Sequence, residues 1–173
     1  MKRQVLLLLF GILVFTSCNH YESKVAISSS ENSEIDTNLF GEWTLTSEND
    51  KDKISGYLEV IPFNDTEYLI QLNEVADSSK YIKSILNFRM YSSVVQKNEY
   101  LNVQFIGSDS EKTFMIYRIK SISGNRYKVF YLSKEQFNIE FKDSASFYEY
   151  IEKHSKEFEK AFEVEGILER KIN

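Results

Sequence analysis

The sequence predicts a mainly β domain, built as a rolled antiparallel meander with one helix close to the C-terminus. Eight segments between residues 42 and 141 alternate apolar and polar side chains with a period of two, which is typical of strands with one buried face. Turn-forming residues separate most of these segments, and a later segment carries apolar residues at helical spacing. With 173 residues and 42% hydrophobic content, the chain can form one domain with a substantial core.

The N-terminal residues have the pattern of an export signal. Lys2 and Arg3 precede an unbroken apolar run over residues 5–15. This run is shorter than the roughly 20 residues that a bilayer-spanning helix needs. We therefore expect residues 1–17 to be a signal peptide that is removed after export.

A single cysteine follows this signal. The residues Phe15-Thr16-Ser17-Cys18 resemble the lipobox of bacterial lipoproteins, although Phe15 stands where that family usually has Leu. The resemblance implies that the signal is cut before Cys18 and that Cys18 carries a diacylglycerol. Several acyl chains on one terminus hold a protein firmly on a bilayer, whereas one chain binds reversibly. The alternative is an incidental cysteine behind an ordinary signal peptide.

The composition indicates a bacterial source and an envelope location. Sixteen Lys against five Arg, with many Ile and Asn, suggest an AT-rich genome, and with Ser17-Cys18 the chain looks like a lipoprotein of the Bacteroidetes group. No acidic cluster follows Cys18, so we expect attachment to the outer membrane with the domain facing the periplasm. Loss of Lys2 and Arg3 would leave 19 basic against 26 acidic side chains, so anionic lipids would not attract the domain.

Residues 18–37 are expected to form the lipidated cysteine and a flexible tether, followed by a single β-rich domain over residues 38–173. The tether segment is polar, contains Ser28-Ser29-Ser30, and has few apolar residues to bury. His20 lies in this segment and is expected to be solvated.

The strands are expected in order along the remaining chain. Gly124-Asn125 is the sharpest turn signal between them, because both residues tolerate the positive φ of a tight hairpin. The segment 114–122 is apolar on both faces and therefore needs a second cover, which a packed helix would supply. The predicted strands are residues 42–45, 56–61, 68–73, 86–91, 101–105, 114–119, 127–132 and 136–141.

The helix is expected after Asp143-Ser144, which can cap its N-terminus. Its apolar stripe contains Phe147, Ile151, Phe158 and Phe162. His154 lies at the edge of this stripe and is interpreted as a half-exposed structural residue. Gly166 breaks the pattern, and residues 167–172 are predicted to be a short closing strand.

The order of these elements resembles the lipocalins and the lipocalin-like domains of bacterial lipoproteins. Gly41-Glu42-Trp43 matches the Gly-x-Trp that opens this family, and a helix precedes the last strand. The resemblance implies a lipocalin-like barrel in which Trp43 plugs one end, covered by Arg170 or Arg118 as a cation–π partner. The alternative fold is a different rolled sheet packed against the C-terminal helix.

The sequence contains no arrangement that points to catalysis. A Gly-rich phosphate loop, a His-Glu-x-x-His motif and a Gly-x-Ser-x-Gly elbow are all missing. One cysteine and two histidines are too few for the common structural metal sites. A net charge of −5, with acidic residues interleaved among the basic ones, is unlike a nucleic-acid-binding surface. We therefore predict no catalytic or metal site, no cofactor, no nucleic-acid partner and no enzymatic activity.

Three function hypotheses remain, of which the third, an enzyme, has no supporting arrangement of residues and would be favoured by a buried Asp/Glu pair in a cleft. The first is a membrane-anchored module that binds a small apolar ligand or peptide; the second is an accessory protein that binds another envelope protein. Tyr57, Tyr91, Tyr117 and Tyr131 would line a cavity or partner surface, or would simply cover the two faces of a small sheet. An interior cavity above roughly 300 Å³ favours the first hypothesis, and a filled interior with an exposed aromatic patch favours the second.

Overall fold

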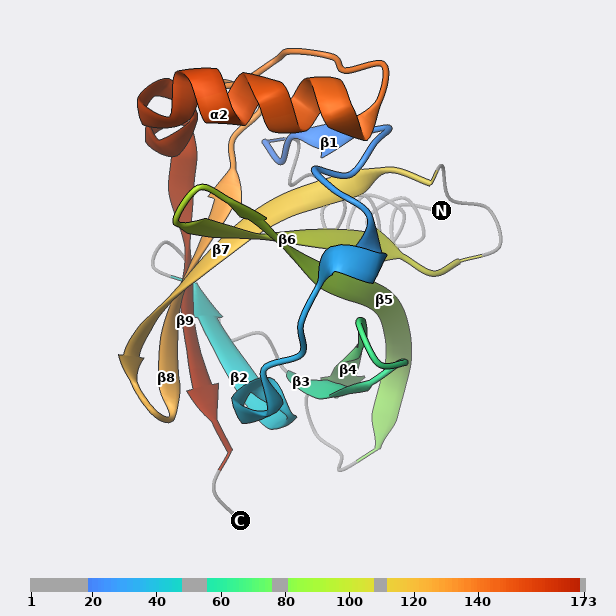
Figure 1. The fold of residues 1–173 in the computed structure, drawn as a ribbon. Coiled ribbons are helices and arrows are strands. Elements are labelled where there is room, and N and C mark those ends of the chain that lie inside the picture. Colours follow the sequence, from blue (N-terminus) through green and yellow to red (C-terminus); the bar gives the residue numbers. More distant parts are fainter. Residues whose placement is uncertain (1–18, 48–55, 76–80, 108–111, 172–173) are drawn as a thin grey trace, which may run out of the picture.

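The computed structural model describes residues 19–47, 56–75, 81–107 and 112–171. In this part of the chain, nine strands form one antiparallel sheet, and one long helix, α2 (Ser144–Lys160), lies beside it (Figure 1). Two short 3₁₀ helices, η1 (Ser30–Asn32) and η2 (Thr37–Leu39), precede the main strands. The strands are β1 (Glu22–Ser23), β2 (Gly41–Ser47), β3 (Gly56–Pro62), β4 (Tyr68–Val75), β5 (Ile82–Val95), β6 (Asn98–Phe105), β7 (Phe114–Ser123), β8 (Arg126–Leu132) and β9 (Phe162–Arg170).

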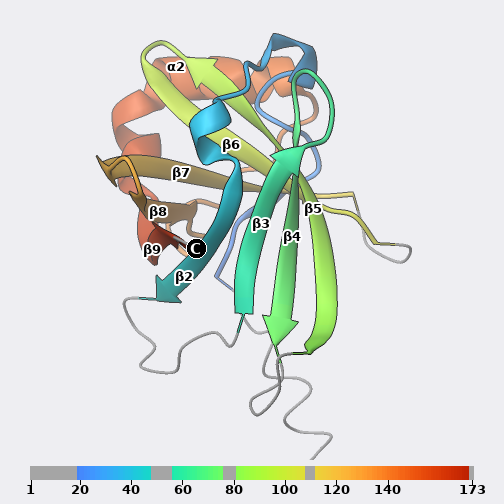
Figure 2. The ribbon, with the colours of Figure 1, turned by 90° about the horizontal axis from the view of Figure 1, so that it is seen from below.

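The strands β2 to β9 form a closed ring (Figures 1 and 2). Each strand pairs with the next one along the chain, and β9 pairs with both β8 and β2. Trp43 faces Arg170 and Leu45 faces Leu168 where β2 and β9 meet. The prediction of a mainly antiparallel β protein with a C-terminal helix is confirmed.

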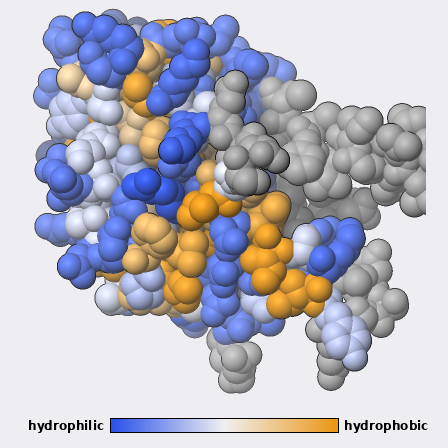
Figure 3. Space-filling view, turned by 90° about the vertical axis from the view of Figure 1, so that its right-hand side faces the viewer, coloured by the Kyte–Doolittle hydropathy of each residue, from blue (hydrophilic) through white to orange (hydrophobic). Residues whose placement is uncertain are grey.

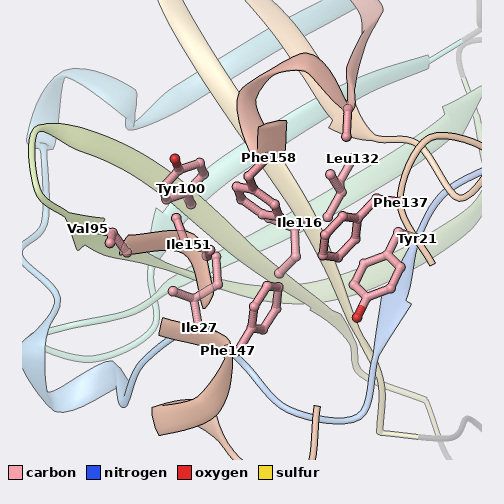
Figure 4. Packing of buried hydrophobic residues seen from close by; sticks show 11 residues of the cluster. Tyr21, Ile27, Val95, Tyr100, Ile116, Leu132, Phe137, Phe147, Ile151 and Phe158 are labelled. Atoms are coloured by element: carbon pink, nitrogen blue, oxygen red, sulfur yellow. The ribbon is translucent and has the colours of Figure 1, made fainter. Parts of the chain in front are cut away.

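Alternate side chains of the ring strands enter two separate hydrophobic cores. Along β6, Leu101 and Val103 face the interior of the ring, where Trp43 also lies. Tyr100 belongs to the outer core, which fills the space between the ring and α2 (Figure 4). Residues 114–122 are apolar on both faces because they contribute to both cores: Ile116 packs in the outer core, and Met115 packs in the interior of the ring.

The helix α2 begins with a capping box and buries one stripe. Asp143 accepts a hydrogen bond from the backbone N–H of Ser146 at 2.8 Å, which satisfies an unpaired donor of the first turn. Phe147, Ile151 and Phe158 are fully buried against the outer face of the ring. These three positions were expected from the helical spacing; the fourth expected member, Phe162, was placed on the helix wrongly and is the first residue of β9.

The eighth predicted strand is wrong. Residues 136–141 form no strand, although Phe137 is buried and Phe141 stacks on Phe147 with 4.2 Å between ring centroids. Phe137 and Phe141 pack with the residues of α2, whereas Ile139 between them is 38% exposed, so the alternation does not report a buried strand face. The ring has no free edge for this segment, because β9, which is longer than predicted, occupies the place between β8 and β2.

The expected tether is corrected for residues 19–40, called the N-terminal strap below. The strap lies along the outside of β5 and β6 and then reaches the end of the ring where β2 begins (Figure 1). Ile27 is completely buried, and its backbone N–H donates to Asn102 Oδ1 at 2.9 Å. Ser33 Oγ accepts from the backbone N–H of Ser92 at 2.9 Å. Polar side chains on the strands therefore bind a segment that has few apolar residues of its own. Cys18 and residues 1–17 lie outside the described residues.

Tyr91 on β5 predicts a loss of stability in alkaline solution. Burial raises the pKa of Tyr91 from 10.0 to about 12, and the side chain is 4% exposed. Between these values the unfolded chain binds fewer protons than the folded one, so the free energy of unfolding falls as pH rises from about 10 to 12. We expect Tyr91→Phe to make this fall shallower by up to about 1.4 kcal/mol per pH unit. Denaturant unfolding at pH 8, 10 and 11 measures the slope, with Tyr81→Phe as the exposed control.

Candidate functional site: the cavity inside the ring

The ring encloses a cavity of about 760 Å³. Every ring strand from β2 to β9 contributes at least one side chain to its wall, so the cavity is the interior of the ring itself. Most of these side chains are aliphatic or aromatic, and the polar ones are Glu22, Thr113, Tyr117 and Glu165. The apolar lining consists of Leu45, Leu58, Ile70, Leu72, Leu86, Phe88, Met90, Leu101, Val103, Phe105, Met115, Ile119, Val129 and Leu168.

One end of the ring, called the Trp43 end, is filled by Trp43 and Arg170. Trp43 is 2% exposed, and the guanidinium carbon of Arg170 lies 4.3 Å from the centroid of its ring. Trp43 Nε1 donates to the carbonyl of Leu39 at 2.8 Å, and Arg170 Nη1 donates to the carbonyl of Phe40 at 2.6 Å. These bonds hold the strap across this end.

Gly41 makes the close approach at the Trp43 end possible. Its φ of +121° is in a region that favours glycine, and a Cβ at this position would lie 2.7 Å from Arg170 Nη1. The structure thus brings together Trp43 and Arg170, the pair singled out in the sequence. Arg118, the alternative partner, lies instead on the outer side, where it pairs with Glu159 and covers the ring of Tyr100.

The opposite end, called the β1 end, holds the polar part of the cavity wall. The last residue pair between β7 and β8 at this end is Tyr117↔Tyr131. Further along β7, Met115 pairs with Glu22 of β1 instead. The strap therefore continues the wall of the ring after β8 has ended. This arrangement places Glu22 in the cavity wall together with Glu165 of β9.

Each of the two carboxylates has a polar partner. Thr113 Oγ1 donates to Glu22 Oε2 at 3.0 Å, and His20 Nε2 lies 3.0 Å from Glu165 Oε2. The side chain of His20 is only 12% exposed, so the expectation that it is solvated is corrected. No Lys or Arg appears among the described residues that line the cavity, so its charged side chains are acidic.

Tyr117 lies beside these carboxylates. Burial raises the pKa of its hydroxyl well above the usual range, and the nearby charges of Glu165 and Glu22 raise this pKa further. Its ring centroid lies 5.6 Å from that of His20. The hydroxyl of Tyr117 therefore stays protonated beside two carboxylates.

The four tyrosines singled out in the sequence do not share one surface. Tyr117 lines the cavity, and Tyr131 lies next to it on β8, where it donates to Glu163 Oε2 at 2.8 Å. Tyr91 is buried outside the cavity wall, and Tyr57 is half-buried beneath Lys171, whose Nζ lies 4.4 Å from its ring centroid. Only the first two of these residues belong near the candidate site.

The carboxylates of the cavity were missed in the sequence. Glu22 lies in the segment predicted to be a tether, and Thr113 lies between two strands. Contacts such as His20 to Glu165 join residues 145 positions apart, and a single sequence carries no local signal for such a pair. The aliphatic lining could be anticipated, because it follows the period-two pattern.

Within the described residues, no group of three or more potential metal ligands is found, and no helix has the length and apolar character needed to cross a membrane. Comparisons with protein-family models, with curated proteins and with solved structures found no match for this chain. The cavity inside the ring is therefore the feature of the described structure that indicates a function.

Proposed function

We propose that this protein is a lipid-anchored envelope protein that binds a small apolar molecule inside its ring of strands. The observation that carries the proposal is the cavity of about 760 Å³ with an almost entirely apolar wall. Sites for small molecules are typically about 300–1,000 Å³, mostly apolar, and supplied with a few polar groups. A core of this size would otherwise be filled with side chains, because protein interiors are close-packed.

We further propose that the ring is a lipocalin-like barrel. The support is the opening Gly41-Glu42-Trp43, the contact of Arg170 with Trp43, and the helix before the closing strand. An eight-stranded barrel can enclose one small ligand, which agrees with the size of the cavity.

A substitution in the cavity wall tests ligand binding. Leu86 lines the cavity, whereas its neighbour Ile85 is 48% exposed. We expect Leu86→Trp to lower the affinity for 1-dodecanol at least tenfold, because the indole fills space that the probe needs. Native mass spectrometry of the purified full chain measures the bound probe, and Ile85→Trp is the matched control.

Wild-type protein and Ile85→Trp should each retain one dodecanol per chain. Absence of binding to the wild type, or equal binding by both variants, would contradict the proposed function. In that case, the accessory role in binding another envelope protein becomes the better hypothesis.

We also propose that acylation of Cys18 holds the β1 end close to the bilayer. Asn19 is already fixed to the body: its carbonyl accepts from the backbone N–H of Lys134 at 2.6 Å, and its side chain donates to Tyr131 at 3.3 Å. Glu22, in the cavity wall, follows Cys18 by only four positions, a reach of at most about 14 Å. This arrangement supports direct exchange of an apolar ligand between the membrane and the cavity.

Exposed apolar side chains support this orientation. Tyr81, Ile82 and Ile85 lie at the start of β5, and Ile106 follows the end of β6. Antiparallel pairing puts all four at the β1 end of the ring. Figure 3, which shows the face on the right-hand side of Figure 1, has apolar side chains gathered over its lower half. Such side chains can enter the interfacial region of a bilayer.

Removal of the acylated thiol tests the anchor. We expect Cys18→Ser to abolish labelling by a radioactive fatty acid and to leave the leader uncleaved. Metabolic labelling, membrane fractionation and mass spectrometry of the N-terminus measure these outcomes. Unchanged labelling of the variant, or an unmodified thiol at Cys18 of the native protein, would contradict lipidation.

A further inference from the structure

We propose that the ligand is an amphiphilic amine, whose apolar chain fills the ring while its cationic head lies between Glu22 and Glu165. This inference rests on the proposed function, because it names the chemical class of molecule that the same cavity would bind.

The first argument is the charge of the cavity wall. Its ionisable side chains are the acidic Glu22 and Glu165 together with Tyr117, and the described lining contains no Lys or Arg. Among the described residues, the basic side chain within ion-pair distance of either carboxylate is His20, which lies 3.0 Å from Glu165 and carries charge only when protonated. A cationic head would therefore reduce the repulsion between the carboxylates, whereas a fatty carboxylate would add a third negative charge beside them.

The Tyr117 hydroxyl, which has only a weak hydrogen-bond partner among the residues described, gives further support. Tyr117 lies in the cavity wall, and in the described part of the chain its hydroxyl contacts only Met115 Sδ, at 3.9 Å. A thioether sulfur is a weak acceptor, so this buried hydroxyl lacks a good partner. An ammonium head between the carboxylates can donate a hydrogen bond to the Tyr117 oxygen and can also interact with its aromatic face.

The second argument is the distribution of polar groups. The named polar residues Glu22, Thr113 and Glu165 all belong to segments of the β1 end, and Tyr117 lies next to them. Toward the Trp43 end, the wall consists of side chains such as Ile70 and Met90. A molecule with one polar head and one apolar body matches this division, whereas an apolar molecule without a head would make no polar contact with the carboxylates.

Three probes with the same chain length test the inference on the full-length protein. Dodecylamine, 1-dodecanol and dodecanoate are titrated below their critical micelle concentrations, and bound probe is counted by native mass spectrometry. We expect affinity to fall in that order, with at least a tenfold difference between the amine and the acid. Glu165→Gln and Glu22→Gln should each weaken dodecylamine at least fivefold and change dodecanol by less than twofold.

Glu169→Gln is the matched control, because Glu169 is on the same strand as Glu165 and its side chain is 61% exposed. The dodecanol titration also shows whether each variant retains a folded cavity. If none of the three probes binds, the proposed function fails. If dodecanol binds but the amine binds no better, or if both Glu→Gln variants keep the amine preference, the head-group inference alone is overturned.

Discussion

Replacement of Trp43 by alanine is expected to lower the free energy of unfolding by about 3–5 kcal/mol, the usual cost of deleting a buried aromatic ring. Trp43 is 2% exposed and lies between Arg170 and Tyr127, whose ring centroid is 5.4 Å away. The truncation also removes the hydrogen bond to the Leu39 carbonyl, which holds the strap. For a domain of this size, the melting temperature should fall by roughly 10 °C. Thermal and denaturant unfolding measure this loss.

Arg170→Gln separates the contribution of the cation from that of the ring. It removes the cation–π contact and the charged donor to the Phe40 carbonyl but leaves the indole in place. We expect a smaller loss of about 2 kcal/mol. A loss below about 1 kcal/mol for Trp43→Ala would show that this end of the ring does not depend on the indole.

Replacement of Phe158 by alanine is expected to cost a similar 3–5 kcal/mol, but from the other core. Phe158 is completely buried between α2 and the ring. Its ring lies 5.1 Å from that of Phe137 and 5.3 Å from that of Tyr100, in edge-to-face contacts. Denaturant unfolding measures the loss, and Glu152→Ala on the exposed side of the same helix is the control.

The two cores make a second readout possible. Phe158 lies outside the ring and does not line the cavity. The folded fraction of Phe158→Ala should therefore bind 1-dodecanol with the wild-type stoichiometry. Loss of binding in folded protein would indicate that α2 controls the shape of the cavity, contrary to the separation described above.

Local patterns predicted most of the sheet. The alternation around Leu101 and Val103 reports which side chains share a face, and the ring strands use that face as the pattern indicates. The same pattern was misleading at residues 136–141, because Phe137 and Phe141 pack with a helix while Ile139 between them is exposed. Pairing partners, which distinguish the two cases, are not encoded in the period.

The strap shows a second limit of local patterns. A segment with few apolar residues was expected to be flexible, yet Ile27 is fully buried and Ser33 binds the backbone of Ser92. Its order depends on polar side chains presented by β5 and β6, which a scan for apolar residues does not detect. The anchor proposed at Cys18 would therefore lie close to the cavity and not at the end of a long tether.

The sequence by itself determined the β class of this protein and the capped helix with its buried stripe, and it left the partner of Trp43 open between Arg170 and Arg118. Only the tertiary structure decided that the ring encloses a cavity and that Glu22 and Glu165 both line it. The physical reason is that burial patterns are local and depend on the direction of each side chain. The enclosed volume depends on how eight strands close around it, and the meeting of two carboxylates depends on contacts between distant parts of the chain.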